Sequence, residues 1–364
     1  MIKILHVISD SNIGGAGHQL LNLIKGLDRN IFEVIVIVPQ NAELKNMLDE
    51  IGVKHMGAPY LAERSFSIRA IWYLYKIIKE LRPDIVHTHA ALSARIGARF
   101  YTRCKIVNTR HCAFPITGRQ KKLRWAVRIA EWFLGGTTVA VSALAKERLM
   151  QQGVSEKKIM VVNNGIDTSL YKYDEAIRKE TRTELGITED IFCVGHIGRM
   201  EPEKNHAFLL EVFKIVLKQR NSVLVLVGCG TLKKDIQARA KELGIEDNVL
   251  FLGTRTDANR LYQCFDVLVM PSSAEGFGLV AVEAQCSGLG CVLSEHFPEV
   301  VKLSDYVKFL QLDDFTRWAE ETLNLTGQNR NEGQTNVIKS KLDAKTMCEA
   351  MTKLYLGIEE EKNA

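Results

Sequence analysis

The stretch Pro271-Ser272-Ser273-Ala274-Glu275-Gly276-Phe277-Gly278-Leu279-Val280-Ala281-Val282-Glu283-Ala284 decides the fold of this chain. The apolar run DVLVM at 266–270 predicts a buried strand, which the proline and the two serines end. The apolar spacing after Gly278 predicts a helix. Free backbone N–H groups at a helix start form a natural phosphate site. The stretch therefore predicts a strand, a tight loop and a helix N-terminus that face a ligand.

Two carboxylates in this stretch indicate a ligand that is more than phosphate. Glu275 lies in the predicted loop, and Glu283 lies about two turns into the predicted helix. Carboxylates accept hydrogen bonds from hydroxyl groups, which a sugar and a ribose both carry. A nucleotide sugar has a sugar at each end and phosphate between them, so the stretch favours that class of ligand.

The E-x7-E arrangement of "EGFGLVAVEA" resembles the signature of the retaining GT-B glycosyltransferases of glycosyltransferase family 4 (glycosyl transferases group 1). Six further landmarks of that family appear in the family's order and extend the resemblance over nearly the whole chain: "SNIGGAGHQ", "DIVHTHA", "VNTRH", "VVNNGID", "HIGRMEPEKN" and "LVGCG". The resemblance implies an α/β protein of GT-B fold, in which two Rossmann-like doubly wound domains face each other across a cleft.

Alternating strand and helix patterns predict the same organisation. The resemblance places an N-terminal, acceptor-side domain at 1–167, a nucleotide-sugar donor domain at 168–342, and a last helix at 343–364 that crosses back to the first domain. Apolar runs predict strands of the first domain at 3–9, 31–38, 53–56, 84–89, 105–111 and 138–142. The tail helix is expected to run from Asp343 to Lys362.

Composition limits the class of protein. The 364 residues are enough for two domains, and no apolar run reaches the length of about 18 residues that a transmembrane helix needs. The N-terminus lacks a signal-peptide pattern. Eight scattered cysteines form no C-x2-C pair, which fits buried thiols in a reducing cytosol rather than a zinc site. A cytoplasmic protein is expected.

Charge is unevenly spread along the chain. Residues 1–165 hold 24 Lys and Arg against 12 Asp and Glu, whereas the remainder holds 24 against 31. Between Ile85 and Ala130 there are ten basic residues and no acidic one. This favours an anionic partner, although a solvated basic face is the alternative. No RNA-binding or helix-turn-helix pattern is present, so no nucleic acid partner is expected.

A basic, aromatic segment at 118–136, "GRQKKLRWAVRIAEWFLGG", predicts a helix that lies in the headgroup region on the inner face of the cell membrane. The alternative is that Leu123, Val127, Ala130 and Leu134 pack this helix on its own sheet and that the aromatic residues join them. The membrane-facing candidates are Lys121, Lys122, Arg124, Trp125 and Arg128.

Candidate ligand contacts in the first domain lie at predicted strand ends, where doubly wound sheets bind ligands. Gly14 and Gly15 allow backbone to approach a phosphate, and by resemblance they lie beside the donor diphosphate. The spacing is not G-x-G-x-x-G, so it does not support a dinucleotide site. By resemblance His111 approaches the donor sugar, and His89 is the weaker candidate for a sugar or acceptor contact. A structural role is the alternative for both histidines.

In the second domain Arg199 and Lys204 flank a strand-to-helix loop, where two cations suit a diphosphate. Ordinary surface charge is the alternative, but the spacing matches the family's G-R-x(4)-K. Neither Lys204 nor Glu275 is expected in the core. By resemblance Thr254 and Arg255 contact the base through their backbone, Glu275 contacts the donor sugar and Glu283 the ribose. The remaining donor-binding candidates are Gly276, Phe277, Gly278 and Leu279.

The expected reaction transfers a sugar from a nucleotide sugar, with UDP the commonest carrier, to a glycan or lipid-linked acceptor in cell-surface polysaccharide or glycolipid synthesis. The chain contains no D-x-D triplet, so departure without a metal is favoured and no metal or other cofactor is expected. The resemblance implies a hexosyltransferase with a front-face retaining mechanism and no protein nucleophile. The catalytic candidates are His111, Glu275, Arg199 and Lys204.

Two other functions stay open. UDP-sugar 2-epimerases share the GT-B fold and bind the same class of ligand, although the E-x7-E and G-R-x(4)-K spacings favour a transferase. A non-catalytic protein that binds membrane through the basic half is the second alternative.

Overall fold

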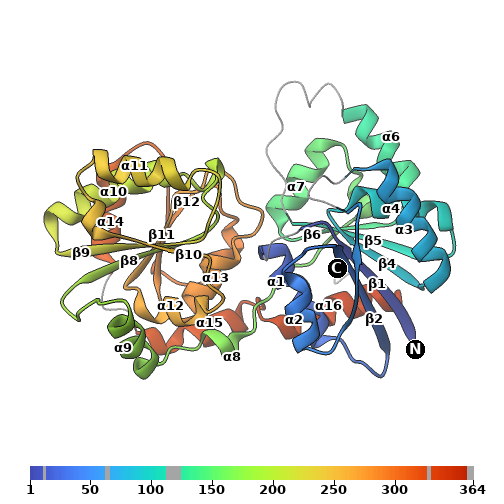
Figure 1. The fold of residues 1–364 in the computed structure, drawn as a ribbon, viewed down its shortest axis with the longest axis horizontal. Helices are drawn as coiled ribbons and strands as arrows, with labels where there is room; N and C mark the ends of the chain where they lie inside the picture. The colour runs from blue at the N-terminus through green and yellow to red at the C-terminus, as the bar shows by residue number, and fades with distance from the viewer. Residues whose placement is uncertain (11–13, 62–65, 112–123, 326–328, 359–364) are drawn as a thin grey trace, which may run out of the picture. The chain divides into compact units, whose positions relative to one another are not determined.

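The computed structural model describes residues 1–10, 14–61, 66–111, 124–325 and 329–358. The chain divides into two compact units (Figure 1). Unit 1 consists of Met1–Gly165 and Ala344–Ala364, and unit 2 consists of Ile166–Asp343. Each unit contains one parallel β-sheet with helices on both faces, so the doubly wound α/β prediction is confirmed.

Unit 1 has a seven-stranded sheet in the order β3-β2-β1-β4-β5-β6-β7. Its strands are β1 (Ile2–Ile8), β2 (Phe32–Pro39), β3 (Lys54–Ala58), β4 (Ile85–His89), β5 (Lys105–Arg110), β6 (Thr137–Ala140) and β7 (Ile159–Val161). Its helices are α1 (Gly15–Gly26), α2 (Leu44–Glu50), α3 (Ile68–Leu81), α4 (Leu92–Tyr101), α6 (Arg124–Leu134), α7 (Ala143–Gln152) and α16 (Ala344–Leu356).

Unit 2 has a six-stranded sheet in the order β10-β9-β8-β11-β12-β13. Its strands are β8 (Phe192–Ile197), β9 (Ser222–Val227), β10 (Val249–Gly253), β11 (Val267–Met270), β12 (Gly290–Ser294) and β13 (Val307–Leu310). Its helices are α8 (Thr168–Tyr171), α9 (Glu175–Glu184), α10 (His206–Gln219), α11 (Lys233–Glu242), α12 (Ala258–Cys264), α13 (Leu279–Cys286), α14 (Phe315–Asn324) and α15 (Gly333–Lys339).

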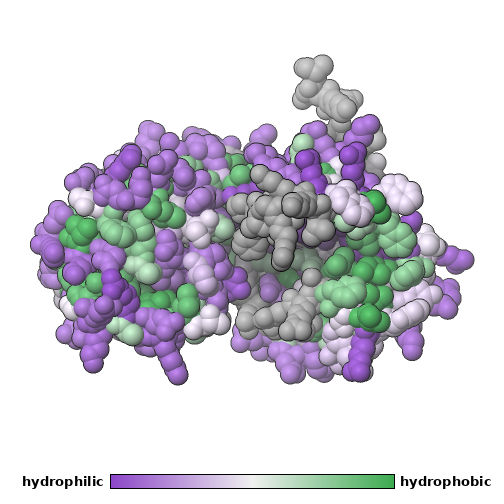
Figure 2. Space-filling model, turned by 90° about the horizontal axis from the view of Figure 1, so that it is seen from above, coloured by the Kyte–Doolittle hydropathy of each residue, from purple (hydrophilic) through white to green (hydrophobic). Residues whose placement is uncertain are grey.

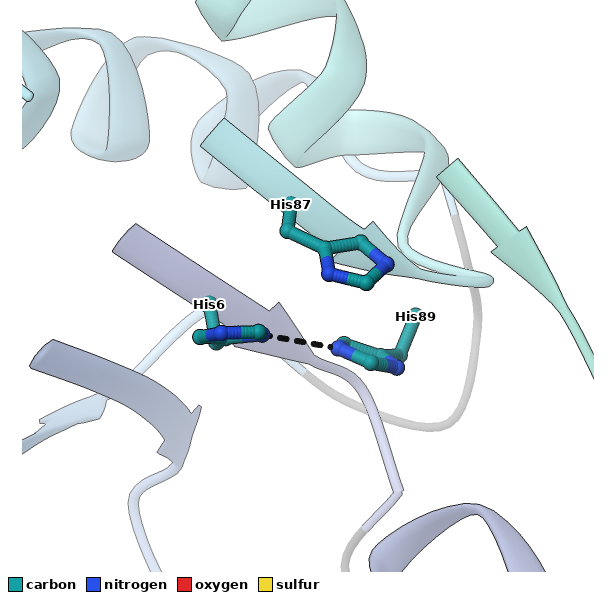
Figure 3. A group of neighbouring side chains, drawn as sticks. All are labelled: His6, His87 and His89. Atoms are coloured by element: carbon teal, nitrogen blue, oxygen red, sulfur yellow. Dashed lines mark hydrogen bonds between the residues drawn. The ribbon is translucent and has the colours of Figure 1, made fainter. Parts of the chain in front are cut away.

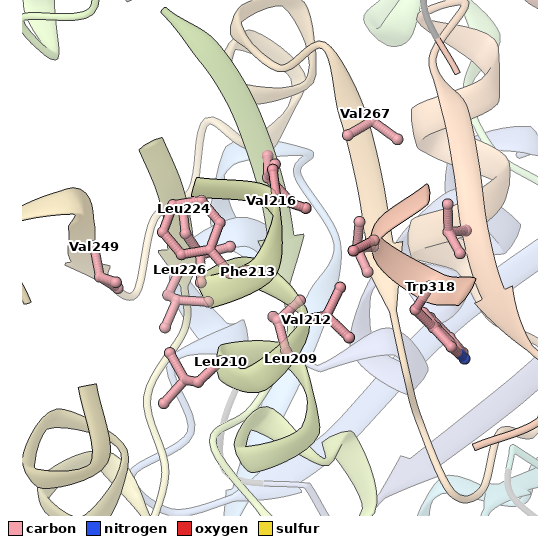
Figure 4. Packing of buried hydrophobic residues seen from close by; sticks show 14 of the residues in the cluster. Leu209, Leu210, Val212, Phe213, Val216, Leu224, Leu226, Val249, Val267 and Trp318 are labelled. Carbon is pink, nitrogen blue, oxygen red and sulfur yellow. The ribbon is translucent and has the colours of Figure 1, made fainter. Parts of the chain in front are cut away.

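The sequences of the strands are nearly continuous apolar runs, because helices cover both faces of each sheet. Every residue of β9 and of β11 is buried. Figure 4 shows the core of unit 2, where Phe213 and Val216 of α10 lie with Leu224 of β9 and Trp318 of α14 in one hydrophobic cluster. Each such side chain contributes about 1.5–3 kcal/mol on burial, so these contacts hold the loops at the strand ends on a rigid base.

The last helix, α16, packs in unit 1 against α1. Met347, Met351 and Tyr355 are buried in the same cluster as residues of β1 and β5. The helices approach so closely that a Cβ atom at Gly26 would clash with the Cys348 side chain. The helix ends at Leu356, because Gly357 has a left-handed φ of +73°, so the prediction that it reaches Lys362 is wrong.

The strand order reverses beside the first strand of each sheet. In unit 1 the first strand, β1, lies between β2 and β4, and in unit 2 the first strand, β8, lies between β9 and β11. Ligands of doubly wound sheets bind beyond the carboxyl ends of the strands at this reversal. The loops that follow β1, β4, β8 and β11 are therefore the places to look for a site.

Candidate functional site

In unit 2 the loops that follow β8 and β11 meet at the strand reversal. The backbone N–H of Ser273 donates a hydrogen bond of 2.8 Å to the carbonyl oxygen of Glu203. Beside it, Nζ of Lys204 lies 2.5 Å from Oε1 of Glu275 in an ion pair. The fold thus brings together two donor-site candidates that are far apart in the sequence.

The Lys204–Glu275 pair is more buried than the sequence indicates. Glu275 is only 8% exposed, and the Lys204 side chain is 17% exposed. The expectation that Glu275 lies outside the core is therefore wrong. The carboxylate is covered because the loop after β8 folds against it, which no local pattern in the sequence reveals.

Arg199, the other candidate cation, reaches solvent. Its side chain is 69% exposed and forms an ion pair of 3.0 Å with Oε1 of Glu203. The second acidic neighbour, Glu201, accepts hydrogen bonds from the backbone N–H and the hydroxyl of Thr231. Only one of the two nearby carboxylates therefore offsets the charge of Arg199 by direct contact.

The helix after the loop begins as predicted. Gly278 is the N-cap of α13 with a φ of +88°, a left-handed conformation that favours glycine, and a Cβ there would clash with the ring of Phe297. Leu279 is the first helical residue. Phe277 is buried, and it therefore supports the loop from within. Gly276 is buried beside it.

Glu283 lies about one turn into α13, not two, and its carboxylate is held by tyrosines. The hydroxyl of Tyr262 donates a 2.7 Å hydrogen bond to Oε2 of Glu283. Burial and the nearby Glu283 raise the pKa of Tyr262 and of Tyr171 well above the ordinary tyrosine value, so both hydroxyls stay protonated donors. Sequence reasoning missed both tyrosines, since neither belongs to a motif.

Thr254 and Arg255 follow β10. The Arg255 guanidinium is engaged by Asp257, at 2.7 Å and 2.8 Å, and by Glu184 at 3.1 Å. Its side chain is thus held within the protein, while Thr254 is exposed. The contact of these two residues with a base stays a prediction.

In unit 1 the glycine pair begins α1. Gly14 is the N-cap with an extended backbone, at φ −103°, that any residue adopts, and Gly15 is the first helical residue. A Cβ at Gly14 would make only an ordinary contact of 3.7 Å with Oδ2 of Asp10. Among the described residues, no contact therefore demands glycine at position 14, and its place beside a diphosphate stays a prediction.

Three histidines of unit 1 form a hydrogen-bonded chain that ends at the carboxyl edge of the sheet. Nδ1 of His6, in β1, lies 3.0 Å from Nε2 of His89, the last residue of β4. Nδ1 of His89 lies 3.1 Å from Nε2 of His111, which follows β5. Figure 3 shows the link between His6 and His89. His89 is 1% exposed, so it is shielded from solvent and lies deeper in the unit than His111. Sequence reasoning missed His6 altogether.

The fourth histidine, His87, makes separate contacts. Its Nδ1 lies 2.6 Å from the hydroxyl of Tyr355, and its Nε2 lies 2.7 Å from Oγ1 of Thr109. Within the described part of the chain, His6, His87 and His89 are the group of side chains that could hold a metal ion. Both ring nitrogens of His87 and of His89 are already engaged, so a metal would have to displace those hydrogen bonds.

Burial keeps this cluster uncharged. It lowers the pKa of His6 to about 3 and that of His111 to about 4. It lowers the pKa values of His87 and His89 well below the ordinary value of histidine, with smaller contributions from the neighbouring imidazoles. All four rings are therefore neutral near pH 7.

The segment predicted to face a membrane forms α6 from Arg124 onward, whereas Lys121 and Lys122 lie outside the described residues. The helix is anchored by a bidentate ion pair between buried Arg95 of α4 and Glu131, with N–O distances of 2.8 Å and 2.7 Å.

The outer side of α6 remains exposed. Trp125 is 66% and Trp132 is 76% exposed, and Arg124 and Arg128 are exposed as well. Of the residues expected to pack inward, Leu134 is buried and Val127 is half-buried, but Ala130 is exposed, and Leu123 lies outside the described residues. The alternative in which the aromatic residues join the core is therefore wrong.

This exposed surface extends over α4 and α3. The ring of Trp72 in α3 stacks on that of Phe100 in α4 at 6.4 Å, and Arg99 of α4 lies over the ring of Phe133 in α6 at 5.8 Å. Figure 2 shows hydrophobic side chains, in green, gathered on the side of unit 1. We call this surface the aromatic face. Its exposed members are Ile68, Trp72, Phe100, Trp125, Ile129, Trp132 and Phe133.

Exposed cations lie on or just after the same three helices as the aromatic face. They are Arg69, Lys76, Lys79, Arg99, Arg103, Arg124 and Arg128. Glu80 is the exposed acidic residue on the same three helices, since Glu131 is paired with Arg95. In the part of the chain that the structure describes, every helix is too short or too polar to cross a bilayer.

Comparison with known proteins agrees with this fold and these motifs. Residues 13–170 match the model of Glycosyltransferase Family 4, and residues 177–310 match that of Glycosyl transferases group 1. Two parallel, doubly wound units with these motifs define a GT-B glycosyltransferase. The chain belongs to glycosyltransferase family 4, so the predicted family, fold and enzyme class are confirmed.

Individual relatives cover most of the chain. It is 31% identical to an Escherichia coli UDP-Gal:α-D-GlcNAc-diphosphoundecaprenol α-1,3-galactosyltransferase over 80% of this chain and 79% of that protein. It is 24% identical to the Staphylococcus aureus capsular polysaccharide biosynthesis glycosyltransferase CapH over 85% of each chain. The crystal structure of Anabaena HepE in complex with UDP and glucose matches with a TM-score of 0.81 at 21% identity, over 98% of this chain and 100% of that one.

Proposed function

We propose that this protein is a retaining hexosyltransferase that uses a UDP-sugar and a lipid-linked acceptor in the synthesis of a cell-surface polysaccharide or glycolipid. The observation that carries the proposal is the meeting of Lys204 and Glu275 at the strand reversal of unit 2. The ammonium group of Lys204 can pair with the negative charge of a sugar diphosphate, and the carboxylate of Glu275 can accept hydrogen bonds from its hydroxyl groups.

The ion pair indicates how a donor is received. A diphosphate carries more negative charge than Glu275, so it competes for the ammonium group of Lys204. The carboxylate is then released to accept hydrogen bonds from the sugar. Arg199, exposed beside the same loop, adds a second cation for the leaving diphosphate. Fixed cations that stabilise the leaving group lower the barrier without a metal ion.

The relatives support the choice of donor and acceptor. The E. coli relative is named for transfer of galactose from UDP-Gal to a diphosphoundecaprenol-linked GlcNAc. The HepE structure contains UDP and glucose. A UDP-hexose and an acceptor on a lipid diphosphate are therefore the first combination to test.

The aromatic face supports an acceptor that stays in a membrane. Two exposed tryptophans beside exposed arginines suit the headgroup region, where the indole rings enter the interface and the cations meet anionic lipids. Each cation near an anionic surface contributes about 1 kcal/mol, so four or five are enough for reversible binding. We propose a peripheral protein on the inner face of the cell membrane.

The epimerase alternative is disfavoured by family membership. An epimerase would convert UDP-N-acetylglucosamine to a new sugar nucleotide with no acceptor present. A non-catalytic membrane protein would have no reason to keep the pair Lys204–Glu275 together with Glu283 and its tyrosines.

A ligand panel tests the proposal. The purified protein is heated with UDP, GDP, UDP-glucose, UDP-galactose and UDP-N-acetylglucosamine, and the donor that raises the melting temperature most is then incubated with a bacterial lipid extract. We expect stabilisation by UDP and by one UDP-hexose, and UDP release that depends on the extract. Preference for GDP would overturn the choice of base, and a new sugar nucleotide without extract would identify an epimerase.

A further inference from the structure

The histidine chain of unit 1 couples a buried residue to a candidate contact. His6, His89 and His111 come from three adjacent strands or their ends, in the order β1, β4 and β5. Their rings are nearly parallel, with centroid distances of 5.3 Å in both pairs. The chain begins inside the sheet at His6, which is fully buried, and ends beyond the carboxyl end of β5 at His111.

The two links of the chain must have the same direction. A neutral imidazole carries one N–H group and one lone pair, and His89 uses both of its nitrogens. If His89 accepts from His6 it must donate to His111, and if it donates to His6 it must accept from His111. In the first arrangement Nδ1 of His111 carries a hydrogen, and in the second it is a bare acceptor.

The burial of the two terminal ring nitrogens favours the first arrangement, in which Nδ1 of His111 carries the hydrogen. Nε2 of His6 and Nδ1 of His111 are buried and have no hydrogen-bond partner among the described residues. Orphaned buried N–H groups are rarer in proteins than under-satisfied acceptors. The hydrogen is therefore less costly on Nδ1 of His111, where a ligand can accept it, than on Nε2 of His6, which has no hydrogen-bond partner in the described part of the unit.

We propose that His6 and His89 are positioning residues, which fix the ring orientation and the tautomer of His111 so that it presents an Nδ1–H donor to the donor sugar. This inference rests on the proposed function together with the family resemblance, which implies that His111 approaches the donor sugar. Because the rings are neutral near pH 7, the donor is present without a competing positive charge. The ionisable side chains packed on the chain, His87 of β4 and Tyr355 of α16, are neutral as well.

A matched pair of variants at His89 separates the two links. The amide of asparagine reaches the place of the histidine Nδ1, whereas that of glutamine reaches the place of Nε2. His89→Asn therefore keeps a donor to His111 and loses the link to His6. His89→Gln keeps the link to His6 and loses the one to His111, at similar size and polarity.

The direct readout is the tautomer of His111 in the unliganded protein. Nitrogen NMR of the histidine rings distinguishes Nδ1–H from Nε2–H, and loss of signals in His111→Ala assigns them. We expect Nδ1–H on His111 in the wild type and in His89→Asn, and a mixture of tautomers in His89→Gln. A bare Nδ1 in the wild type overturns the proposal, even if no variant folds.

Kinetics provide the second readout. We expect kcat/KM to fall about tenfold in His89→Gln and less than about threefold in His89→Asn, as loss and retention of one oriented hydrogen bond imply. In His89→Gln the acid limb of the pH profile of kcat/KM should also move to higher pH, because a freed His111 regains water and burial then lowers its pKa less. Equal losses in both variants, with no change in the acid limb, would indicate a merely structural role.

Failure of the proposed function is seen separately. If His111→Ala transfers sugar like the wild type, the sugar contact is wrongly assigned. The tautomer of His111 and its response to His89→Gln are measured without substrate. They therefore test whether His6 and His89 orient His111, whatever the outcome for the sugar contact.

Discussion

Lys204 and Glu275 form an ion pair of 2.5 Å between the loops that follow two adjacent central strands of unit 2. Each side chain has only a small exposed fraction, so each stabilises the charge of the other. The same two groups are the candidates for holding a sugar diphosphate. Stability and donor binding are therefore coupled at this pair, a relationship that neither residue reveals alone.

The first prediction concerns this coupling. Lys204→Ala and Glu275→Ala should each reduce transfer by about a hundredfold or more, as loss of charge stabilisation at a reacting group does. Each should also destabilise the protein by about 1–3 kcal/mol, because the remaining charge is left largely buried without its partner. Thermal unfolding and initial rates of the same preparations measure both effects.

The double variant is the matched control. When both charges are removed, no partly buried ion remains, so its melting temperature should exceed that of at least one single variant while its activity stays lost. A double variant whose destabilisation equals the sum of the two single effects would show that the ion pair contributes nothing. Wild-type turnover in either single variant would remove that residue from the site.

The second prediction is that transfer survives excess EDTA. Lys204 and Arg199 supply positive charge beside the proposed diphosphate, and the chain contains no D-x-D triplet. Rates measured before and after dialysis against EDTA should agree within about twofold, since fixed cations replace the metal. Complete loss of activity that Mg²⁺ or Mn²⁺ restores would show that the cations are not sufficient.

The third prediction concerns the support of Glu283. Tyr262→Phe removes the 2.7 Å hydrogen bond to this carboxylate and should raise the KM of the UDP-sugar about tenfold with little change in kcat, because a ribose contact acts equally on ground and transition states. Donor titrations of the initial rate measure this. Tyr306→Phe, at an exposed tyrosine of the same unit, is the control and should leave KM unchanged. A fall in kcat alone would contradict a ribose role for Glu283.

The fourth prediction is that the aromatic face binds anionic vesicles. The protein should sediment with vesicles that contain phosphatidylglycerol, and binding should weaken as salt shortens the Debye length. Replacement of Lys121, Lys122, Arg124 and Arg128 by Ser should remove about 4 kcal/mol, or about a thousandfold in partitioning. Trp125→Ala with Trp132→Ala should weaken binding at constant charge.

The control for this experiment carries the same change of charge elsewhere. Lys214 and Lys218 of α10 and Lys233 and Lys234 of α11 lie in unit 2, and their replacement by Ser should leave sedimentation unchanged. Equal recovery with neutral and anionic vesicles, or equal effects of the two sets of variants, would argue against docking through the aromatic face.

The fold was predictable because its signals are local. The apolar run of β11, the glycine at the N-cap of α13 and the helical spacing after it lie next to each other in the sequence, and each specifies its own element. The same holds for β4 and for α3, which Pro83 ends soon after Leu81. Repetition of such units is enough to predict two doubly wound sheets.

The burial of the site residues was not predictable, because it depends on contacts between distant segments. Glu275 is covered by the loop after β8, and Glu283 is held by Tyr262, which lies in another helix. His6 joins His89 only because β1 and β4 are neighbours in the sheet. The outward face of α6 likewise follows from the anchor between Glu131 and Arg95, which the helical pattern does not contain.

The stereochemistry of the transferred sugar tests the central claim most directly. The protein is incubated with a UDP-α-hexose and a bacterial lipid extract, and the anomeric configuration of the sugar in the isolated lipid product is determined by NMR, with Glu275→Gln as the blank. We predict an α-linked product that is absent from the blank. A β-linked product would contradict a retaining transferase, and equal product from the blank would contradict the assignment of the donor site to the loop that carries Glu275.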